Sequence, residues 1–156
     1  MRMSRTPVIY VDADACPVKA EVERVAYRHG IVVVHVAGRG MRPSRDPMVR
    51  VVGVAQGTDA ADDWIVDAAE AGDMVITADI GLAARAIEKS ASVLSPTGKL
   101  FTAEGIGMAL AMRDLNKHLR ETGESDGHNP SFSPKDRSRF LVACDEMVSR
   151  ALRGAK

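Results

Sequence analysis

Short apolar runs rich in β-branched residues alternate with helical segments along most of this chain, and no other feature of the sequence restricts the fold as strongly. The strand-like runs cover residues 8–11, 31–36, 48–54, 74–77 and 91–94. Strands that alternate with helices form a mostly parallel sheet with right-handed crossovers, which places helices on both faces. The sequence therefore predicts the α/β class, with a central, mostly parallel sheet flanked by helices.

The helical segments carry the usual signals for the start and the end of a helix. Pro17 suits the first turn of the first helix, and Gly30 ends it. Further helices are expected after Thr58, after Asp79, over residues 102–122 and from about Pro134. The segment around residues 123–133 is loop-like and is expected to be mobile. A chain of 156 residues predicts a single domain over residues 1–156.

Composition excludes several classes of protein. No apolar run approaches the roughly 20 residues of a membrane span, and the N-terminal residues lack a secretory h-region. Neither the two cysteines nor the four histidines show metal-binding spacing, which argues against zinc catalysis. Cys16 is interpreted as a buried thiol rather than a nucleophile, because no His is placed by sequence to act as its base. We expect a reduced, cytoplasmic protein with no membrane association.

The charges are balanced overall but unevenly distributed. The formal net charge is zero, yet residues 59–79 hold seven acids and no Lys or Arg. Residues 39–50 hold four Arg and one acid, and residues 135–156 hold six bases and three acids. An acidic centre between basic segments suits a metal site that handles a phosphorylated polymer. Ordinary solvated helix faces are the alternative explanation.

Aspartates lie at the ends of two predicted strands. Asp12 and Asp14 follow the first strand, Asp79 follows the fourth, and Asp59 begins a helix that should start at the same edge of the sheet. Neighbouring carboxylates repel each other, and a hard divalent cation with oxygen ligands removes that repulsion. The sequence therefore predicts a Mg²⁺ or Mn²⁺ site. The alternative for Asp14, Asp59 and Asp79 is that each only caps a helix N-terminus, worth about 1 kcal/mol.

Several longer stretches that together run over nearly the whole chain carry a specific combination of motifs. They read VDADACPVKAEVERVAYR, GTDAADDWIV, GDMVITADIGLAARAIEKSA, MRD and FSPKDRSRF. This combination resembles the bacterial YaiI/YqxD family, which lacks an established biochemical function and is itself similar to PIN-like and NYN-type nucleases. The resemblance implies a three-layer PIN-like domain. By the same resemblance, Asp12 corresponds to the first-strand aspartate, Asp59 and Asp62 to the middle acidic motif, and Asp79 to the later T-x-D aspartate.

The chain departs from that family pattern at a few positions. Gly81 stands where a Pro is frequent, and Glu104 lies where an Asn is usual. The turn SPTG replaces a typical PRG, so that Thr97 stands where an Arg is expected. If that Arg contacts phosphate in the family, this chain lacks the contact. The aspartates are unaffected.

The favoured function is a Mg²⁺- or Mn²⁺-dependent nuclease, with RNA preferred over DNA as its substrate. Four aspartates are the predicted catalytic residues: Asp12, Asp14, Asp59 and Asp79. The predicted metal ligands are these four and Asp62, and either Asp62 or Asp63 supports a second ion or orients water. The predicted contacts to nucleic-acid phosphates come from four basic residues: Lys19, Arg39, Arg42 and Arg45.

Two other functions remain open. The DADAC string also resembles the D-x-D of haloacid-dehalogenase-type phosphatases, with Asp12 as nucleophile and Asp14 as acid/base. That mechanism wants a later acidic pair, which the sequence after Asp79 does not supply. The other possibility is a non-catalytic nucleic-acid-binding module that uses the Arg-rich loop and the basic C-terminal helix. Whether the Met-rich and C-terminal helices build a homodimer stays open.

Overall fold

The structure, a computed structural model, describes residues 5–38, 40–55, 59–121 and 132–154. Its centre is a six-stranded sheet with the strand order β3-β2-β1-β4-β5-β6. The strands are β1 (Ile9–Asp12), β2 (Val33–Ala37), β3 (Val49–Gly53), β4 (Met74–Ile76), β5 (Ser92–Leu94) and β6 (Leu100–Phe101). Strands β1 to β5 are parallel to one another, and β6 runs antiparallel to β5. The predicted α/β class with a mostly parallel sheet is confirmed.

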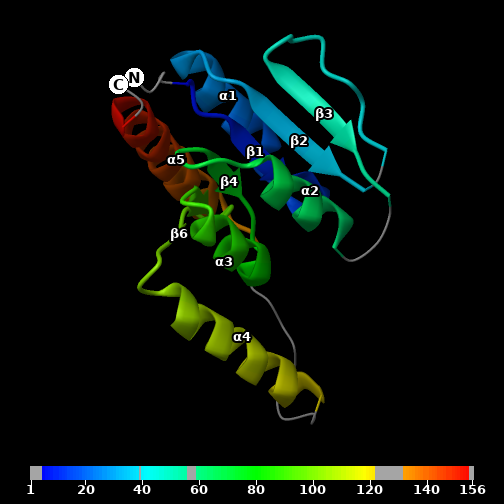
Figure 1. Cartoon of the computed structure of the whole chain (residues 1–156), viewed down its shortest axis with the longest axis vertical. Coiled ribbons are helices and arrows are strands. Elements are labelled where there is room, and N and C mark those ends of the chain that lie inside the picture. Colours follow the sequence, from blue (N-terminus) through cyan, green and yellow to red (C-terminus); the bar gives the residue numbers. More distant parts are fainter. Residues whose placement is uncertain (1–4, 39, 56–58, 122–131, 155–156) are drawn as a thin grey trace.

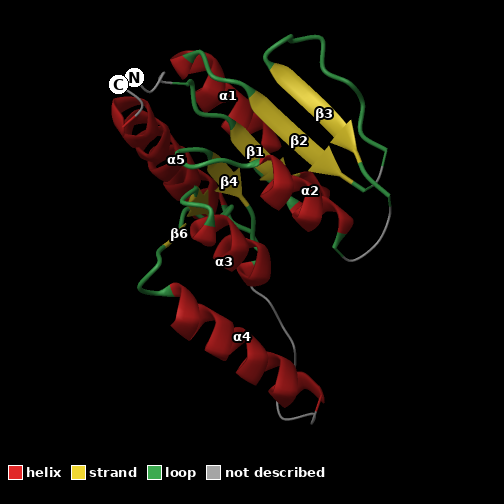
Figure 2. Ribbon diagram, in the orientation of Figure 1, coloured by secondary structure: helices red, strands yellow, loops and turns green. Residues whose placement is uncertain are grey.

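Helices cover both faces of this sheet and complete three layers (Figure 1, Figure 2). One face packs against α1 (Lys19–His29) and α5 (Pro134–Gly154), and the other packs against α2 (Ala60–Ala68) and α3 (Ile80–Glu88). Successive side chains of a strand point to opposite faces, so Ile9 and Val11 belong to the first core cluster while Tyr10 belongs to the second. Burial on both faces explains why the strand runs are apolar without alternation.

The remaining long helix, α4 (Ile106–Glu121), lies outside these layers and extends away from the body of the molecule (Figure 1). Its main packing partner among the elements is α3. No described helix is long and apolar enough to cross a membrane.

Some element boundaries differ from those expected from the sequence. Residues 13–15 form a short 3₁₀ turn, so α1 begins at Lys19 rather than at Pro17. The helix expected from residue 102 begins at Ile106, because residues 102–105 form a turn in which the Thr102 hydroxyl accepts a hydrogen bond from the Gly105 N–H. Strand β6 was not predicted. The expected mobile loop around residues 123–133 lies almost entirely outside the described residues.

The strand order reverses between β1 and β4, and this point fixes where a ligand should bind. From β1 the chain continues through β2 and β3 to one side of the sheet, whereas β5 and β6 lie on the other side of β4. In open α/β sheets, ligands bind outside the carboxyl ends of the strands at such a reversal. The residues that leave the carboxyl ends of β1 and β4 are therefore the first candidates for a functional site.

Candidate active site at the sheet edge

Asp12 and Asp79 are joined through Thr77 across the reversal between β1 and β4. The Thr77 hydroxyl donates a hydrogen bond of 2.9 Å to Asp12 Oδ2 and accepts one of 3.0 Å from the Asp79 N–H. Asp79 Oδ1 accepts a bond of 3.1 Å from the Leu82 N–H, so this carboxylate does cap α3. Burial raises the pKa of Asp12, the Thr77 bond opposes that rise, and the charges of Asp79 and Asp14 add to it.

Asp62 of α2 brings a third carboxyl to the same edge. Its pKa is raised to about 7, first by burial and then by the charges of Asp79 and Asp12, by a hydrogen bond with Asp79 and by the charge of Asp59. At neutral pH the Asp62 carboxyl is therefore protonated in part of the molecules and ionised in the rest. The neighbouring Asp63 points elsewhere, because it forms an ion pair of 2.9 Å with Arg85 of α3. Of the two residues, Asp62 is the one that faces the site.

Asp14 and Asp59 lie around this group, and neither uses its side chain to cap the helix it precedes or begins. Asp14 Oδ2 accepts a hydrogen bond of 2.8 Å from the Gly38 N–H and so ties the end of β1 to the segment that follows β2. Asp59 is the N-cap residue of α2, but its side chain makes no capping bond. The capping explanation thus holds for Asp79 and not for these two residues.

The aspartates lie at one edge of the sheet, but their side chains are not arranged as a complete set of metal ligands. Within the described part of the chain, no three His, Cys, Asp or Glu side chains are arranged to hold a metal ion. Mutual repulsion gives the reason, since ionised carboxylates turn toward donors such as Thr77 and the backbone N–H groups. The donor set consists of oxygen atoms, and the pKa of Asp62 is raised by burial first and then by the negative charges of Asp79, Asp12 and Asp59. Both properties fit a hard divalent cation.

The basic residues predicted to bind phosphate are scattered. The Lys19 ammonium donates to the carbonyls of Ala13, at 3.0 Å, and Cys16, at 2.7 Å, and so braces the turn that carries Asp14. Arg39 lies outside the described residues, and Arg42 is exposed on the loop between β2 and β3.

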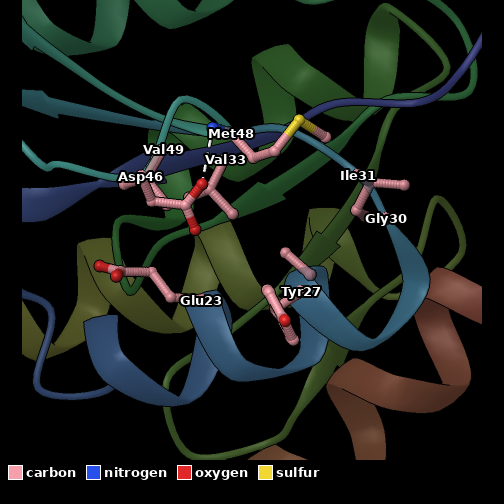
Figure 3. Close-up of a pocket in the computed structure, with 9 residues that line it drawn as sticks. Glu23, Tyr27, Gly30, Ile31, Val33, Asp46, Met48 and Val49 are labelled. Carbon is pink, nitrogen blue, oxygen red and sulfur yellow. Dashed lines mark hydrogen bonds between the residues drawn. The ribbon is translucent and has the colours of Figure 1, made fainter.

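Arg45 lies toward the opposite edge of the sheet from the aspartates. Its neighbour Asp46 lines a hollow of about 150 Å³ beside Val33 and Val49, the first residues of β2 and β3 (Figure 3). In a parallel sheet these residues mark the amino edge. The structure therefore does not bring Arg45 to the carboxylates.

Cys16 is buried near the site. Burial raises the pKa of its thiol, with smaller opposing effects from the Val18 backbone and from Lys19. A thiol with a raised pKa is a poor nucleophile. The interpretation of Cys16 as a structural residue is consistent with this environment.

One basic residue near the aspartates was missed by the sequence analysis. Arg113 of α4 places Nη1 within 2.9 Å of the point where a Cβ on Gly81 would lie, and Asp79 Oδ1 lies 3.2 Å from the same point. In the sequence, Arg113 belongs to the MRD string, within a helical segment that is also rich in methionine. Sequence spacing could not have shown that α4 returns to the start of α3.

Replacing Thr77 with Val should destabilise the protein by about 1–2 kcal/mol, because the partly buried Asp12 carboxylate and the Asp79 N–H both lose their partner. Without the Thr77 bond the pKa of Asp12 rises further, so ionising Asp12 costs more. The loss should therefore be larger at about pH 8 than at about pH 4. Thermal unfolding at both pH values measures it. Thr77→Ser, which keeps the hydroxyl, is the control, and an equal loss at the two pH values would contradict the assignment.

Several bacterial proteins are similar to this chain. The model of an uncharacterised family named YaiI/YqxD matches residues 10–150. This chain belongs to the YaiI/YqxD family. A UPF0178 protein of Mesorhizobium japonicum is 65% identical over 149 residues, which cover 96% of each chain. One from Agrobacterium fabrum is 59% identical and covers 96% of this chain and 98% of its own, and one from Rhizobium etli is 62% identical and covers 92% and 93%.

The family resemblance seen in the sequence is therefore confirmed. No solved structure matched this YaiI/YqxD chain. The likeness to PIN-like nucleases stays a prediction. The names of these relatives state no activity.

Proposed function

We propose that this YaiI/YqxD protein is a Mg²⁺- or Mn²⁺-dependent nuclease that acts on RNA. The observation that carries the proposal is the approach of Asp12, Asp62 and Asp79 at the point where the strand order reverses, with the pKa of Asp62 raised to about 7. A bound cation would stabilise a cluster of carboxylates at such a point, and an oxygen-only set favours Mg²⁺ or Mn²⁺ over zinc.

The residues of the chain would divide the work as follows. Asp12, Asp62 and Asp79 would hold the ion, and Asp14 and Asp59 would supply further negative charge at the rim. Thr77 fixes the orientation of Asp12 through its 2.9 Å bond, and the α3 cap fixes Asp79. When bound, an ion of this kind activates water and stabilises charge on a phosphoryl group.

The test incubates wild type and an Asp12→Asn/Asp79→Asn variant with each of three substrates. Asn can still accept the Thr77 bond and cap α3, so the fold should be retained. Purified protein is incubated with Mn²⁺ and labelled RNA, single-stranded DNA or a generic phosphomonoester. We expect Mn²⁺-dependent cleavage of RNA that the variant does not perform.

The other outcomes each overturn part of the proposal. Turnover of the monoester alone would favour the haloacid-dehalogenase-type phosphatase. Binding of RNA without cleavage, unchanged in the variant, would favour a non-catalytic binding module. Cleavage of DNA but not RNA would keep the nuclease and change its substrate.

A further inference from the structure

Helix α4 is exposed around its whole circumference over two turns. Every residue from 111 to 118 is exposed, whereas each of the helices that cover the sheet has one buried face. An isolated helix of this length is only marginally stable in water, so the few contacts that α4 makes with the body matter. One of them, from Arg113, leads to the aspartates.

The absence of a side chain at Gly81 allows Arg113 to reach the start of α3. A Cβ at Gly81 would lie 2.9 Å from Arg113 Nη1 and 3.2 Å from Asp79 Oδ1, closer than such atoms normally approach. The guanidinium therefore occupies the space beside the first turn of α3, on the same side as the Asp79 carboxylate.

Arg113 has little else to bind in the described part of the chain. Its partner there is the adjacent Asp114, with Nη2 and Oδ1 a long 3.4 Å apart, and 46% of the Arg113 side chain remains exposed. Two other bases near the edge are already engaged, since Lys19 donates to two carbonyls and Arg85 pairs with Asp63. An arginine fork that is open to solvent beside a carboxylate cluster is suited to a phosphate group, which it can bind through two parallel N–H donors.

We propose that Arg113 is the residue that binds the substrate phosphate at this site, and that α4 forms one wall of the path taken by an RNA strand. The inference rests on the proposed function, because the aspartates alone would repel a polyanion. With the carboxylates neutralised by a divalent cation, a phosphodiester could lie between that cation and the Arg113 guanidinium. Arg113 would then position the substrate, while the aspartates hold the ion.

The test measures binding rather than cleavage. Affinity for a labelled single-stranded RNA is followed by fluorescence anisotropy with Ca²⁺ present, over a range of salt concentrations, and Mn²⁺ affinity is measured by calorimetry. Arg113→Met should weaken RNA binding roughly tenfold and lower the salt slope by about one, as expected for one lost phosphate contact. Mn²⁺ affinity should not fall. Lys117→Met, which removes a positive charge from the same exposed helix, should change RNA affinity by less than about twofold.

Gly81→Ala provides a second, independent variant. The new Cβ would displace the flexible end of Arg113, and Ala is favoured over Gly in a helix by up to about 1 kcal/mol. Because the same Cβ would lie 3.2 Å from Asp79 Oδ1, the Mn²⁺ affinity of this variant is measured as well and should not fall. We expect Gly81→Ala to keep or raise the melting temperature and to weaken RNA binding in the same direction as Arg113→Met.

The results separate the inference from the proposed function. If wild type binds Mn²⁺ and RNA while Arg113→Met binds RNA with unchanged affinity and salt slope, the inference is wrong and the metal site stands. Equal losses in Arg113→Met and Lys117→Met would also overturn it, because a diffuse charge effect would then explain both. If wild type binds neither Mn²⁺ nor RNA, the proposed function and the inference fail together.

Discussion

Asp62→Asn should make the metal-free protein more stable at about pH 8 and leave it nearly unchanged at about pH 4. The pKa of Asp62 in the folded protein is raised to about 7, above its value in the unfolded chain. A group with a raised folded pKa contributes its stability below the unfolded pKa and loses it as the pH rises through the folded pKa. Wild type therefore weakens between about pH 4 and pH 7, whereas the Asn variant has no charge to develop.

The size of this effect follows from the shift after allowance for solvent. Taken at face value the shift corresponds to about 4 kcal/mol, and screening at a half-exposed carboxyl reduces it to about 1–2 kcal/mol. For a chain of 156 residues this raises the melting temperature by roughly 2–8 °C. Asp63→Asn is the matched control, because it removes the same charge one residue away, where Asp63 pairs with Arg85. A gain of the same size in Asp63→Asn would show that overall charge, and not the site, is responsible.

Addition of Mn²⁺ should reverse the order of the two proteins. A ligand at about 100 times its Kd stabilises a protein by about 2.7 kcal/mol, and wild type should show a rise of this kind. Asp62→Asn, which lacks one of the ligands, should gain little. A variant that keeps the full Mn²⁺ response would remove Asp62 from the metal site. Melting curves without and with Mn²⁺ thus measure how much Asp62 destabilises the metal-free protein and how much it contributes to Mn²⁺ binding.

The sequence predicted the sheet edge because the information for it is local. Asp12 directly follows a β-branched run, and Asp79 follows another, so both lie at carboxyl ends in any parallel arrangement of the two strands. Local sequence does not determine which of two consecutive acids faces the site. Asp62 and Asp63 differ by 100° around α2, and the direction is set by the packing of Ile65 against the sheet and of Arg85 on α3.

Contacts between residues far apart in the chain could not be predicted from the sequence either, because they too depend on tertiary packing. The position of Arg113 depends on the path of the chain between β5 and α4, including β6, which has only two residues and no periodic signal. Lys19 looked free to bind phosphate, yet its ammonium donates to the Ala13 and Cys16 carbonyls at the 3₁₀ turn. Both cases show charges whose role is decided by tertiary contacts rather than by spacing.

Gly98→Ala should be among the most damaging single substitutions in the molecule. Gly98 closes the turn between β5 and β6 with a φ of +90°, which L residues rarely adopt. A Cβ there would lie 2.8 Å from the Arg139 carbonyl carbon, 3.0 Å from the Arg139 carbonyl oxygen and 3.0 Å from the Phe140 nitrogen. These atoms belong to the backbone of α5, and the Phe140 side chain is fully buried in the core, so the helix cannot move aside cheaply.

Gly72 offers the control that separates the two costs. It has the same φ of +90°, but a Cβ at Gly72 would meet nothing within 4 Å. Gly72→Ala should therefore lose only the conformational term of about 1–2 kcal/mol, whereas Gly98→Ala should lose about 3 kcal/mol or more. Chemical denaturation of both variants beside wild type measures the difference. Equal losses would mean that the turn does not press on α5, and that β5 and the chain leading to α4 are held in place by something other than this contact.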